Sequence, residues 1–523
     1  MKQLLQGKCC STKVISIVLA ALIVLFIGVL VLSFYGISKI IDANIHQSVE
    51  LNENTEQWDR FVDLPIPISL KVYIFNVTNS DEVLNGKKPK LVEIGPYAYK
   101  EKIHKDISST NDDDDSVTYQ KITTVTFDPE QSGDFKETDN ITIVNPALLV
   151  LTEITSPIEQ FVVGGCINKI FLPPYDTLFI TVDIKTILFE GIPFAQASPA
   201  LGYACNIIRN LVIDKTKKMK NVQRIYNSVY TDVVDGLIFS LLGYKIASPD
   251  GIYTVNRGIH DVSQLGNVMK WNHSTHLPFW GRPESTNNDS CQLVHGGDST
   301  IYPPHVTKDD ILSIFTTDVC RSVDIYYTGK DTYKGIEGLR FEPKATTFTS
   351  SLSNVEEDCF CTKQTKNAQG KLSCYLDGVL DVYNCLGVPI LLSFPHFLYA
   401  NASYRTGVEG VTEGDPKIHG IYLLIEPNTG TPLIGRKRVQ FNLVIRPSEH
   451  LTEVTKNIHS TVLPLVWVEE GADLTDDLID MIEDQYFKTV KITKGVKYGL
   501  IAVSAAAVLS AGAILLRKLI WMK

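Results

Sequence analysis

Two long stretches without a charged side chain, one near each end of the chain, limit what this sequence can form. Val14–Ile37 spans 24 residues and Tyr498–Leu516 spans 19 residues. At about 1.5 Å of rise per helical residue, these runs reach roughly 36 and 28 Å, and the hydrocarbon core of a bilayer is about 30 Å thick. A backbone inside lipid must satisfy its own hydrogen bonds, so both runs are predicted to be membrane-spanning helices.

The flanking residues predict that both runs are retained and that both tails are cytoplasmic. The first run is longer than the apolar core of a signal peptide, which has about 7 to 15 residues, and no small-residue cleavage site follows it. Arg517 and Lys518 end the second run and favour a stop-transfer helix over a removable lipid-anchor signal. The tails, residues 1–13 and 517–523, hold six basic residues and no acidic residue.

The segment between the two runs, residues 38–497, is predicted to be a glycosylated ectodomain. Because the whole chain has a net charge of −10 and its tails carry +6, this segment carries −16. Four of its lysines flank the second run, so charge alone orients that helix weakly: Lys488, Lys491, Lys494 and Lys497. All five glycosylation sequons fall within the segment, at Asn76, Asn140, Asn272, Asn288 and Asn401.

The ten cysteines divide between the two sides of the membrane. Cys9 and Cys10 precede the first run and are predicted to be palmitoylated, the alternative being reduced thiols. Six ectodomain cysteines lie close together in the sequence: Cys291, Cys320, Cys359, Cys361, Cys374 and Cys385. Disulfides suit them better than zinc in an oxidising compartment, and spacing alone leaves 15 pairings open. Cys166 and Cys205 stand apart and either form a further disulfide or remain buried thiols.

The pattern of apolar residues predicts one large, strand-rich α+β domain with helical insertions. Alternation of apolar and polar residues predicts strands at Ser69–Thr78, Tyr119–Phe127, Tyr422–Ile425 and Val439–Ile445, among others. The period changes further along the chain, where Pro146–Val163 and Ile207–Ile213 are predicted to be apolar helices. No internal repeat or long low-complexity linker divides the ectodomain.

The sequence carries no motif on which an enzymatic activity could rest. It lacks a Gly-x-Ser-x-Gly elbow, a phosphate loop and a His-Glu-x-x-His helix, so no catalytic residue and no cofactor is predicted. The acidic run Asp112–Asp115 lacks the spaced ligands of a calcium loop and is predicted to be a solvated loop. His273 and His276 have too few supporting ligands for a metal site, and the net negative charge disfavours nucleic-acid binding.

Several long blocks of sequence point to a protein family more specifically than composition and periodicity do. They are residues 70–101, YPPH (302–305), DVCRS (318–322), the Cys-Phe-Cys arrangement, SFPHFLYA (393–400), residues 422–443 and LPLVWVEEGADL (463–474). Together with both apolar runs they cover nearly the whole chain, which resembles the class B scavenger receptor family of fatty-acid translocase-like proteins. TEQWDRF (55–61) and GIYTVNRG (251–258) make it most similar to the insect sensory neuron membrane proteins, of the second subtype.

This resemblance implies a fold and a disulfide pairing. The family ectodomain is a strand-rich, antiparallel barrel with an internal apolar tunnel and a helical bundle at its membrane-distal apex, and residues 146–213 correspond to that apex by position. The implied pairs are Cys291–Cys359, Cys320–Cys385 and Cys361–Cys374.

The resemblance also implies a function. We expect a plasma-membrane, scavenger-type receptor that captures fatty acids, lipids or lipid-derived odorants and pheromones. It would pass them through the tunnel toward the bilayer or a neighbouring receptor. The expected partners are lipophilic small molecules, membrane lipids, and an odorant receptor or odorant-binding protein. The predicted ligand entrance consists of Phe161, Val162, Ile167, Lys169, Ile170, Phe171 and Phe179. The alternative for these residues is ordinary helix packing, with Lys169 as a solvated charge.

Two other functions fit the same scaffold. One is a trafficking receptor of the lysosomal or endosomal membrane that binds a protein cargo, and Leu519-Ile520 resembles half of the sorting signal that it would need. The other is a pattern-recognition or adhesion receptor for particles. Surface staining of the tagged protein would favour the lipid receptor, and lysosomal accumulation would favour the trafficking receptor.

Overall fold

The computed structural model describes residues 12–226, 235–281, 290–349, 358–361, 366–367, 370–448, 455 and 457–521. The chain divides into two compact units. One unit combines Met1–Glu50 with Leu474–Lys523, and the other is Leu51–Asp473. Three predicted modification sites, Cys9, Cys10 and Asn288, lie outside the described residues.

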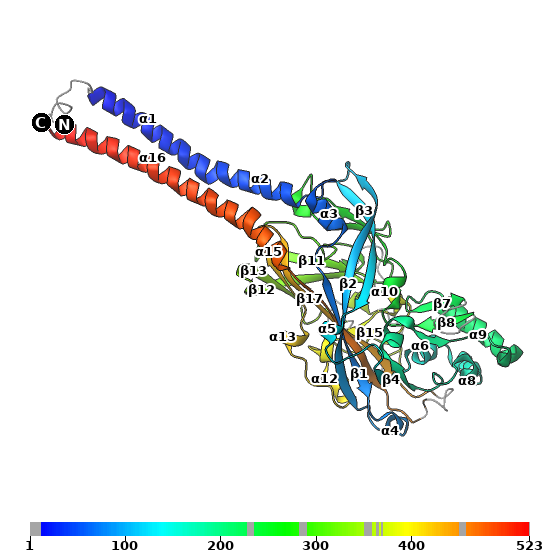
Figure 1. The fold of residues 1–523 in the computed structure, drawn as a ribbon. Helices are drawn as coiled ribbons and strands as arrows, with labels where there is room; N and C mark the ends of the chain where they lie inside the picture. Colours follow the sequence, from blue (N-terminus) through cyan, green and yellow to red (C-terminus); the bar gives the residue numbers. More distant parts are fainter. Residues whose placement is uncertain are drawn as a thin grey trace. The chain divides into compact units, whose positions relative to one another are not determined.

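The terminal unit consists of two long helical segments. The first is continuous through α1 (Thr12–Val31), the π-helical turn η2 (Leu32–Gly36) and α2 (Ile37–Val49). The second runs through α15 (Asp476–Ile482), η9 (Glu483–Phe487) and α16 (Lys488–Trp521). Helices α1 and α16 pack side by side, as Figure 1 shows, and both segments are long and apolar enough to cross a membrane. They contain the two predicted spans and continue beyond them, because no helix-breaking residue follows either apolar run.

A single antiparallel sheet of 13 strands organises the larger unit. Its main path follows the order β10, β9, β3, β2, β1, β18, β17, β16, β13, β12, β11. The bounds are β1 (Ile68–Val77), β2 (Leu91–Asn111), β3 (Ser116–Phe127), β9 (Ile252–Asn256), β10 (Val268–Trp271), β11 (Ile311–Thr316), β12 (Arg321–Tyr333), β13 (Ile336–Pro343), β14 (Leu380–Asp381), β15 (Leu391–Ser393), β16 (Tyr422–Glu426), β17 (Thr431–Ile445) and β18 (Thr461–Asp473). Strand β15 pairs with both β14 and β17. The four predicted strands all lie in this sheet.

The two edges of this sheet are joined by a short segment around Gly296 and Gly297. The Val268 amide of β10 donates to the Gly296 carbonyl at 2.8 Å. The Gly297 amide donates to the Ser313 carbonyl of β11 at 2.8 Å, and the Phe315 amide donates to the Gly297 carbonyl at 2.9 Å. The sheet therefore closes almost completely into a barrel, which leaves few unpaired backbone groups at its edges.

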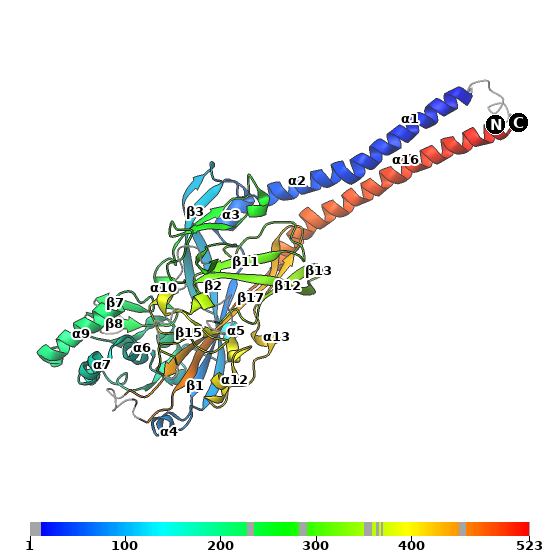
Figure 2. The same cartoon turned by 180° about the vertical axis from the view of Figure 1, so that it is seen from behind.

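Two small sheets and four helices lie together on one flank of the larger unit, as Figures 1 and 2 show from opposite sides. The strands are β4 (Asn140–Val144) with β5 (Phe179–Asp183), and β6 (Ile192–Phe194) with β8 (Asp235–Phe239) and β7 (Val222–Tyr226). The helices are α6 (Pro146–Ile154), α7 (Pro157–Gly164), α8 (Ile167–Ile170) and α9 (Gly202–Thr216). The shorter helices of the larger unit are α3 (Glu56–Val62), α4 (Ser80–Leu84), α5 (Pro129–Ser132), α10 (Gly243–Ala247), α11 (Tyr383–Leu386), α12 (Ala402–Thr406) and α13 (Pro416–His419).

The helix predicted at 146–163 is two helices in the structure. Ser156 caps α7 in a capping box with Glu159, and Pro157 occupies the first helical position. A proline at this position has no amide hydrogen to continue the preceding helix, so α6 ends before it. The prediction at 207–213 lies within the longer helix α9, and the region 146–213 also contains strands β5 and β6.

Four disulfides crosslink the larger unit. Cys291–Cys359, Cys320–Cys385 and Cys361–Cys374 are bonded in the structure, which is the pairing that the family resemblance implies. Cys166 and Cys205, for which the sequence left two possibilities, form the fourth bond. A packed apolar core lies against β11, β12, β13 and β16, and its buried residues include Ile325, Phe341 and Ile425.

Closure of the sheet depends on Gly296, and replacing this glycine by alanine tests that role. Gly296 has a φ of +85°, and a Cβ at this position would lie 2.3 Å from the Ser313 carbonyl oxygen. We expect Gly296→Ala to lower the free energy of unfolding by roughly 3 kcal/mol or more, from the left-handed backbone cost and the clash. The readout is the thermal unfolding of the full-length protein in detergent.

Gly335→Ala is the matched control. Gly335 has a φ of +89°, and nothing lies within 4 Å of the position of its Cβ. This variant carries only the backbone cost, about 1 to 2 kcal/mol. Equal destabilisation by the two variants would contradict the role assigned to Gly296.

Candidate functional site

Five large apolar side chains are exposed on helices α7 and α9, and we call this surface the α7–α9 patch. It consists of Ile158, Phe161 and Val162 on α7 with Tyr203 and Ile207 on α9, exposed by between 42 and 86%. The spacing of three and four residues places the members from each helix on one face of that helix. Contiguous exposed apolar surface of this kind marks an interaction site more often than isolated apolar residues do.

One disulfide and one ion pair hold α7 and α9 antiparallel. Cys166, directly after α7, is bonded to Cys205 near the start of α9, with their Cα atoms 5.5 Å apart. At the opposite ends of the two helices, the Lys215 ammonium lies 2.9 Å from the Glu159 carboxylate. The patch is therefore carried by a crosslinked helix pair that can hold its shape when a ligand binds.

The buried face of α9 fixes this pair onto the rest of the domain. Its inward residues follow helical spacing: Cys205, Ile208, Arg209, Val212, Ile213 and Thr216. Arg209 is 5% exposed, and its guanidinium donates to the Ala195 carbonyl at 2.8 Å and to the Asp235 carboxylate at 2.7 Å. These bonds compensate the buried charge of Arg209. They also anchor the inner face of α9, so that its exposed apolar residues, Tyr203 and Ile207, lie on the outer side.

The structure divides the predicted entrance residues into two groups. Phe161, Val162 and Lys169 are exposed. Four others are buried in the core beneath the helices: Ile167, Ile170, Phe171 and Phe179. Phe171 stacks on Phe194 with ring centroids 5.4 Å apart. Sequence reasoning missed Ile158, Tyr203 and Ile207, although the helical spacing of apolar residues in 157–164 and 202–207 was a usable signal.

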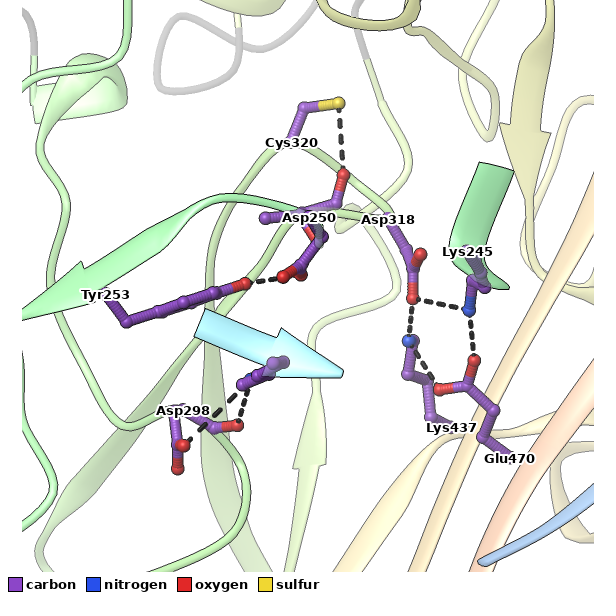
Figure 3. Close-up of polar contacts among 10 residues, drawn as sticks. Lys245, Asp250, Tyr253, Asp298, Asp318, Cys320, Lys437 and Glu470 are labelled. Carbon is purple, nitrogen blue, oxygen red and sulfur yellow. Dashed lines mark hydrogen bonds and ion pairs between the residues drawn. The ribbon is translucent and has the colours of Figure 1, made fainter. Parts of the chain in front are cut away.

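A closed ring of four charged side chains joins α10, the β11–β12 connection, β17 and β18, and Figure 3 shows its contacts. Lys245 of α10 contacts Asp318 at 3.2 Å and Glu470 of β18 at 2.5 Å. Lys437 of β17 contacts Glu470 at 2.6 Å and also bonds Asp318. Asp318 lies between β11 and β12, several strands away from β18 in the sheet order, so the ring joins parts of the sheet that are not neighbours.

The ring is charge-balanced, and this determines the protonation of its members. Although burial disfavours its charge, the cations Lys245 and Lys437 hold the pKa of Asp318 well below its usual range. Burial also opposes the charge of Lys245, but Asp318 and Glu470 hold the pKa of that ammonium well above its usual range. Two cations thus compensate two carboxylates, and no free charge remains for a further acid.

Glu101 of β2 is a third acidic residue, and it interacts with the members of the ring. It is 7% exposed, and burial, followed by repulsion from Glu470, raises the pKa of Glu101 to about 7. Near neutral pH this carboxyl group is therefore partly protonated, which distinguishes it from the ring carboxylates.

A second buried ion pair joins β2 to the segment that closes the barrel. The Lys105 ammonium lies 3.0 Å from the Asp298 carboxylate, and both side chains are fully buried. Tyr119 donates to Asp298 at 2.5 Å, and Lys105 donates to the Thr300 hydroxyl at 2.6 Å. Burial lowers the pKa of Lys105 to about 8, and Lys105 holds the pKa of Asp298 well below its usual range against the effect of burial. Because Asp298 directly follows Gly297, this pair fixes the closing segment to the far wall.

The acidic run Asp112–Asp115 agrees with its prediction only in part. The sequence predicts a solvated loop at Asp112–Asp115; Asp112, Asp113 and Asp114 are exposed as predicted, but Asp115 is 2% exposed. The buried Arg257 guanidinium lies 3.4 Å from Asp115 and 2.5 Å from Asp112, which is itself exposed. Sequence alone gave no partner for these acids, because Arg257 lies more than 140 positions along the chain.

The described sequons lie in different environments. Asn140, Asn272 and Asn401 are exposed, and Asn76 is partly buried in β1. The Asn76 side-chain oxygen accepts a 2.8 Å hydrogen bond from the Thr142 amide. Glycosylation at these positions stays a prediction.

Comparison with known proteins agrees with this architecture. The CD36 family model matches residues 18–515, so the chain belongs to the CD36 family of class B scavenger receptors, which are membrane receptors. It is 31% identical to sensory neuron membrane protein 2 of Anopheles gambiae, over 89% of this chain and 86% of that protein. It is also 31% identical to sensory neuron membrane protein 2 of Heliothis virescens (94 and 91% covered) and 28% identical to sensory neuron membrane protein 1 of Bombyx mori (94 and 88%).

The raised pKa of Glu101 predicts a pH-dependent stability. Because the folded protein holds this proton more tightly than the unfolded chain, whose Glu pKa is about 4.3, its contribution is present below about pH 4.3 and is lost as the pH rises to about 7. Glu101→Gln removes the titration, so we expect it to stabilise the protein at pH 8 relative to wild type by up to roughly 3 kcal/mol. Thermal unfolding at pH 5 and at pH 8 measures the difference.

The exposed Glu130→Gln variant is the control, since it removes a carboxylate outside the barrel. A gain in stability from Glu101→Gln that is the same at pH 5 and pH 8 would contradict the assignment.

Proposed function

We propose that this protein is a plasma-membrane receptor that captures lipophilic ligands at the α7–α9 patch and passes them toward the bilayer. The observation that carries the proposal is five exposed apolar side chains on a crosslinked helix pair in a chain of the CD36 family. The ligand classes are fatty acids, lipids and lipid-derived odorants or pheromones. Two membrane helices hold the protein, with both tails cytoplasmic and residues 38–497 outside the cell.

Capture at the patch needs no reactive group. Each Å² of apolar area that a ligand and the patch remove from water contributes about 25 cal/mol, so a long hydrocarbon chain lying across several of these side chains gains several kcal/mol. Rigid helices lose little conformational freedom on binding, which leaves more of this gain as affinity.

Transfer beyond the patch is proposed to follow the inside of the barrel. The ring side chains of Lys245, Asp318 and Glu470 keep 16 to 18% of their area accessible, and Lys437 keeps 32%. This supports an internal space next to the ring. A path there would pass polar groups, so it differs from the purely apolar tunnel that the family resemblance implies. A charge-balanced ring exerts little force on a neutral ligand.

A binding assay tests the proposal. Full-length protein in phosphatidylcholine vesicles is titrated with a fluorescent long-chain fatty alcohol. Phe161→Gln combined with Ile207→Gln replaces two patch side chains that are 70 and 52% exposed. Losing about 1 kcal/mol of apolar contact at each predicts a dissociation constant raised at least about tenfold.

The matched control is Leu372→Gln combined with Ile418→Gln, at apolar side chains that are 65 and 55% exposed and belong to neither α7 nor α9. It should bind as wild type does. Unchanged affinity in the patch variant, or an equal loss in the control, would refute capture at this surface.

A further inference from the structure

The extracytoplasmic end of α16 carries a row of lysines that capture of a ligand at the patch does not use. We call Lys488, Lys491, Lys494 and Lys497 the lysine stripe; they recur at every third position just before the charge-free run begins at Tyr498. Neighbouring members project about 60° apart around the helix, so all four lie on one half of its circumference.

Most of this positive charge is uncompensated within its own unit. Lys488 bonds Asp484 one turn earlier. Lys491 and Lys494 are exposed, and no ion pair joins either to a carboxylate among the residues that the structure describes. No acidic residue lies three or four positions before or after Lys491, Lys494 or Lys497. Such a row of like charges repels itself unless anions from outside the helix lie beside it.

The level of the stripe along the helix identifies the anions. From Lys491 to Lys497 the helix rises by six residue steps, or about 9 Å, immediately outside the charge-free run. The headgroup layer of a bilayer extends about 5 to 8 Å beyond each side of its hydrocarbon core. The lysine side chains therefore lie at the depth of lipid phosphates.

Aromatic side chains mark the same level on both helical segments. The Lys497 ammonium lies 3.9 Å from the ring centroid of Phe34 in η2 and 5.9 Å from that of Tyr498. Lys39 of α2 lies 6.0 Å from the Tyr35 ring centroid. Phe34, Tyr35 and Tyr498 are all more than half exposed. Aromatic rings with flanking cations are typical of the membrane–water interface.

Charge also segregates along the helical segment. Five exposed acidic residues precede the stripe: Asp476, Asp477, Asp480, Glu483 and Asp484. The acids thus lie farther from the apolar run than the lysines do, an order that favours an anionic membrane surface beside the lysines. A second copy in the same membrane would have the same orientation and would place lysines against lysines, so it fits this surface poorly.

We propose that the lysine stripe binds the anionic headgroups of phospholipids in the leaflet that faces the ectodomain. The proposal rests on the membrane topology given above, but not on ligand capture at the α7–α9 patch. Each lysine contributes a point charge at phosphate depth, and the interfacial rings hold the two helices at that depth. The protein would thereby gather anionic lipids around its spanning helices.

The test compares lipid selectivity in one leaflet. Full-length protein is reconstituted in phosphatidylcholine vesicles, and spin-labelled phosphatidylglycerol or phosphatidylcholine is exchanged into the ectodomain-facing leaflet only, so that the basic tails do not contribute. The motionally restricted fraction of each label gives their relative association constant. We expect phosphatidylglycerol to be preferred, and Lys491→Gln combined with Lys494→Gln to lower that preference at least about threefold. Raising the salt to about 1 M should have the same effect, because the Debye length falls to about 3 Å.

Lys308→Gln combined with Lys417→Gln is the control, since it removes the same charge from exposed sites in the larger unit. Three results would overturn the proposal: no preference in wild type, a preference that survives in the stripe variant, or an equal loss in the control. Resistance of the protein to carbonate extraction reports the spanning helices separately. If the protein were extracted, the shared topology would be wrong, whereas the fatty-alcohol titration alone decides capture at the patch.

Discussion

Closure of the large sheet is the constraint on which the rest of the molecule depends. A strand array of this size exposes long unpaired edges unless its ends meet. Here the ends meet through the backbone of Gly296 and Gly297, which bonds β10 on one side and β11 on the other. The fully buried pair of Asp298 and Lys105 then fixes this junction to β2 across the interior. A buried pair contributes little net stability compared with apolar packing, but a wrong pairing would leave a buried charge uncompensated, so it makes this arrangement specific.

Charged side chains from four segments meet beside the large sheet. Lys437 and Glu470 are cross-strand neighbours on β17 and β18, and Lys245 and Asp318 reach them from α10 and from the β11–β12 connection. Glu101 contributes a third acid to two cations, which explains why burial and Glu470 raise its pKa to about 7 while the ring carboxylates stay ionised. The domain thus contains a polar cluster at the ring, and the apolar tunnel that the family resemblance implies stays a prediction.

The proposed functions belong to two separate outer surfaces, the α7–α9 patch and the lysine stripe. The α7–α9 patch offers apolar contact on a crosslinked helix pair, and the lysine stripe offers positive charge at the depth of lipid headgroups. Neither surface includes a reactive constellation, and both gain affinity from desolvation or from charge. These are properties of a receptor that handles amphiphilic molecules beside a membrane.

Some of this could be predicted from local sequence, because the relevant physics is local. The lengths of the two apolar runs required helices, strand periodicity gave the four strands named from the sequence, and the family blocks implied three disulfide pairs that the structure contains.

What depends on long-range contact could not be predicted in this way. Burial of Ile170 and Phe171 depends on which elements cover them, and the Cys166–Cys205 bond depends on α7 and α9 lying antiparallel. The charged ring combines side chains from four segments spread over more than 220 positions, so no local sequence pattern predicts it. The sequence by itself determined two apolar anchors, an acidic strand-rich domain between them and the lysines beside the second anchor. Only the tertiary structure decided which apolar helix residues face outward and which charges meet, because both depend on contacts between segments that are far apart in the chain.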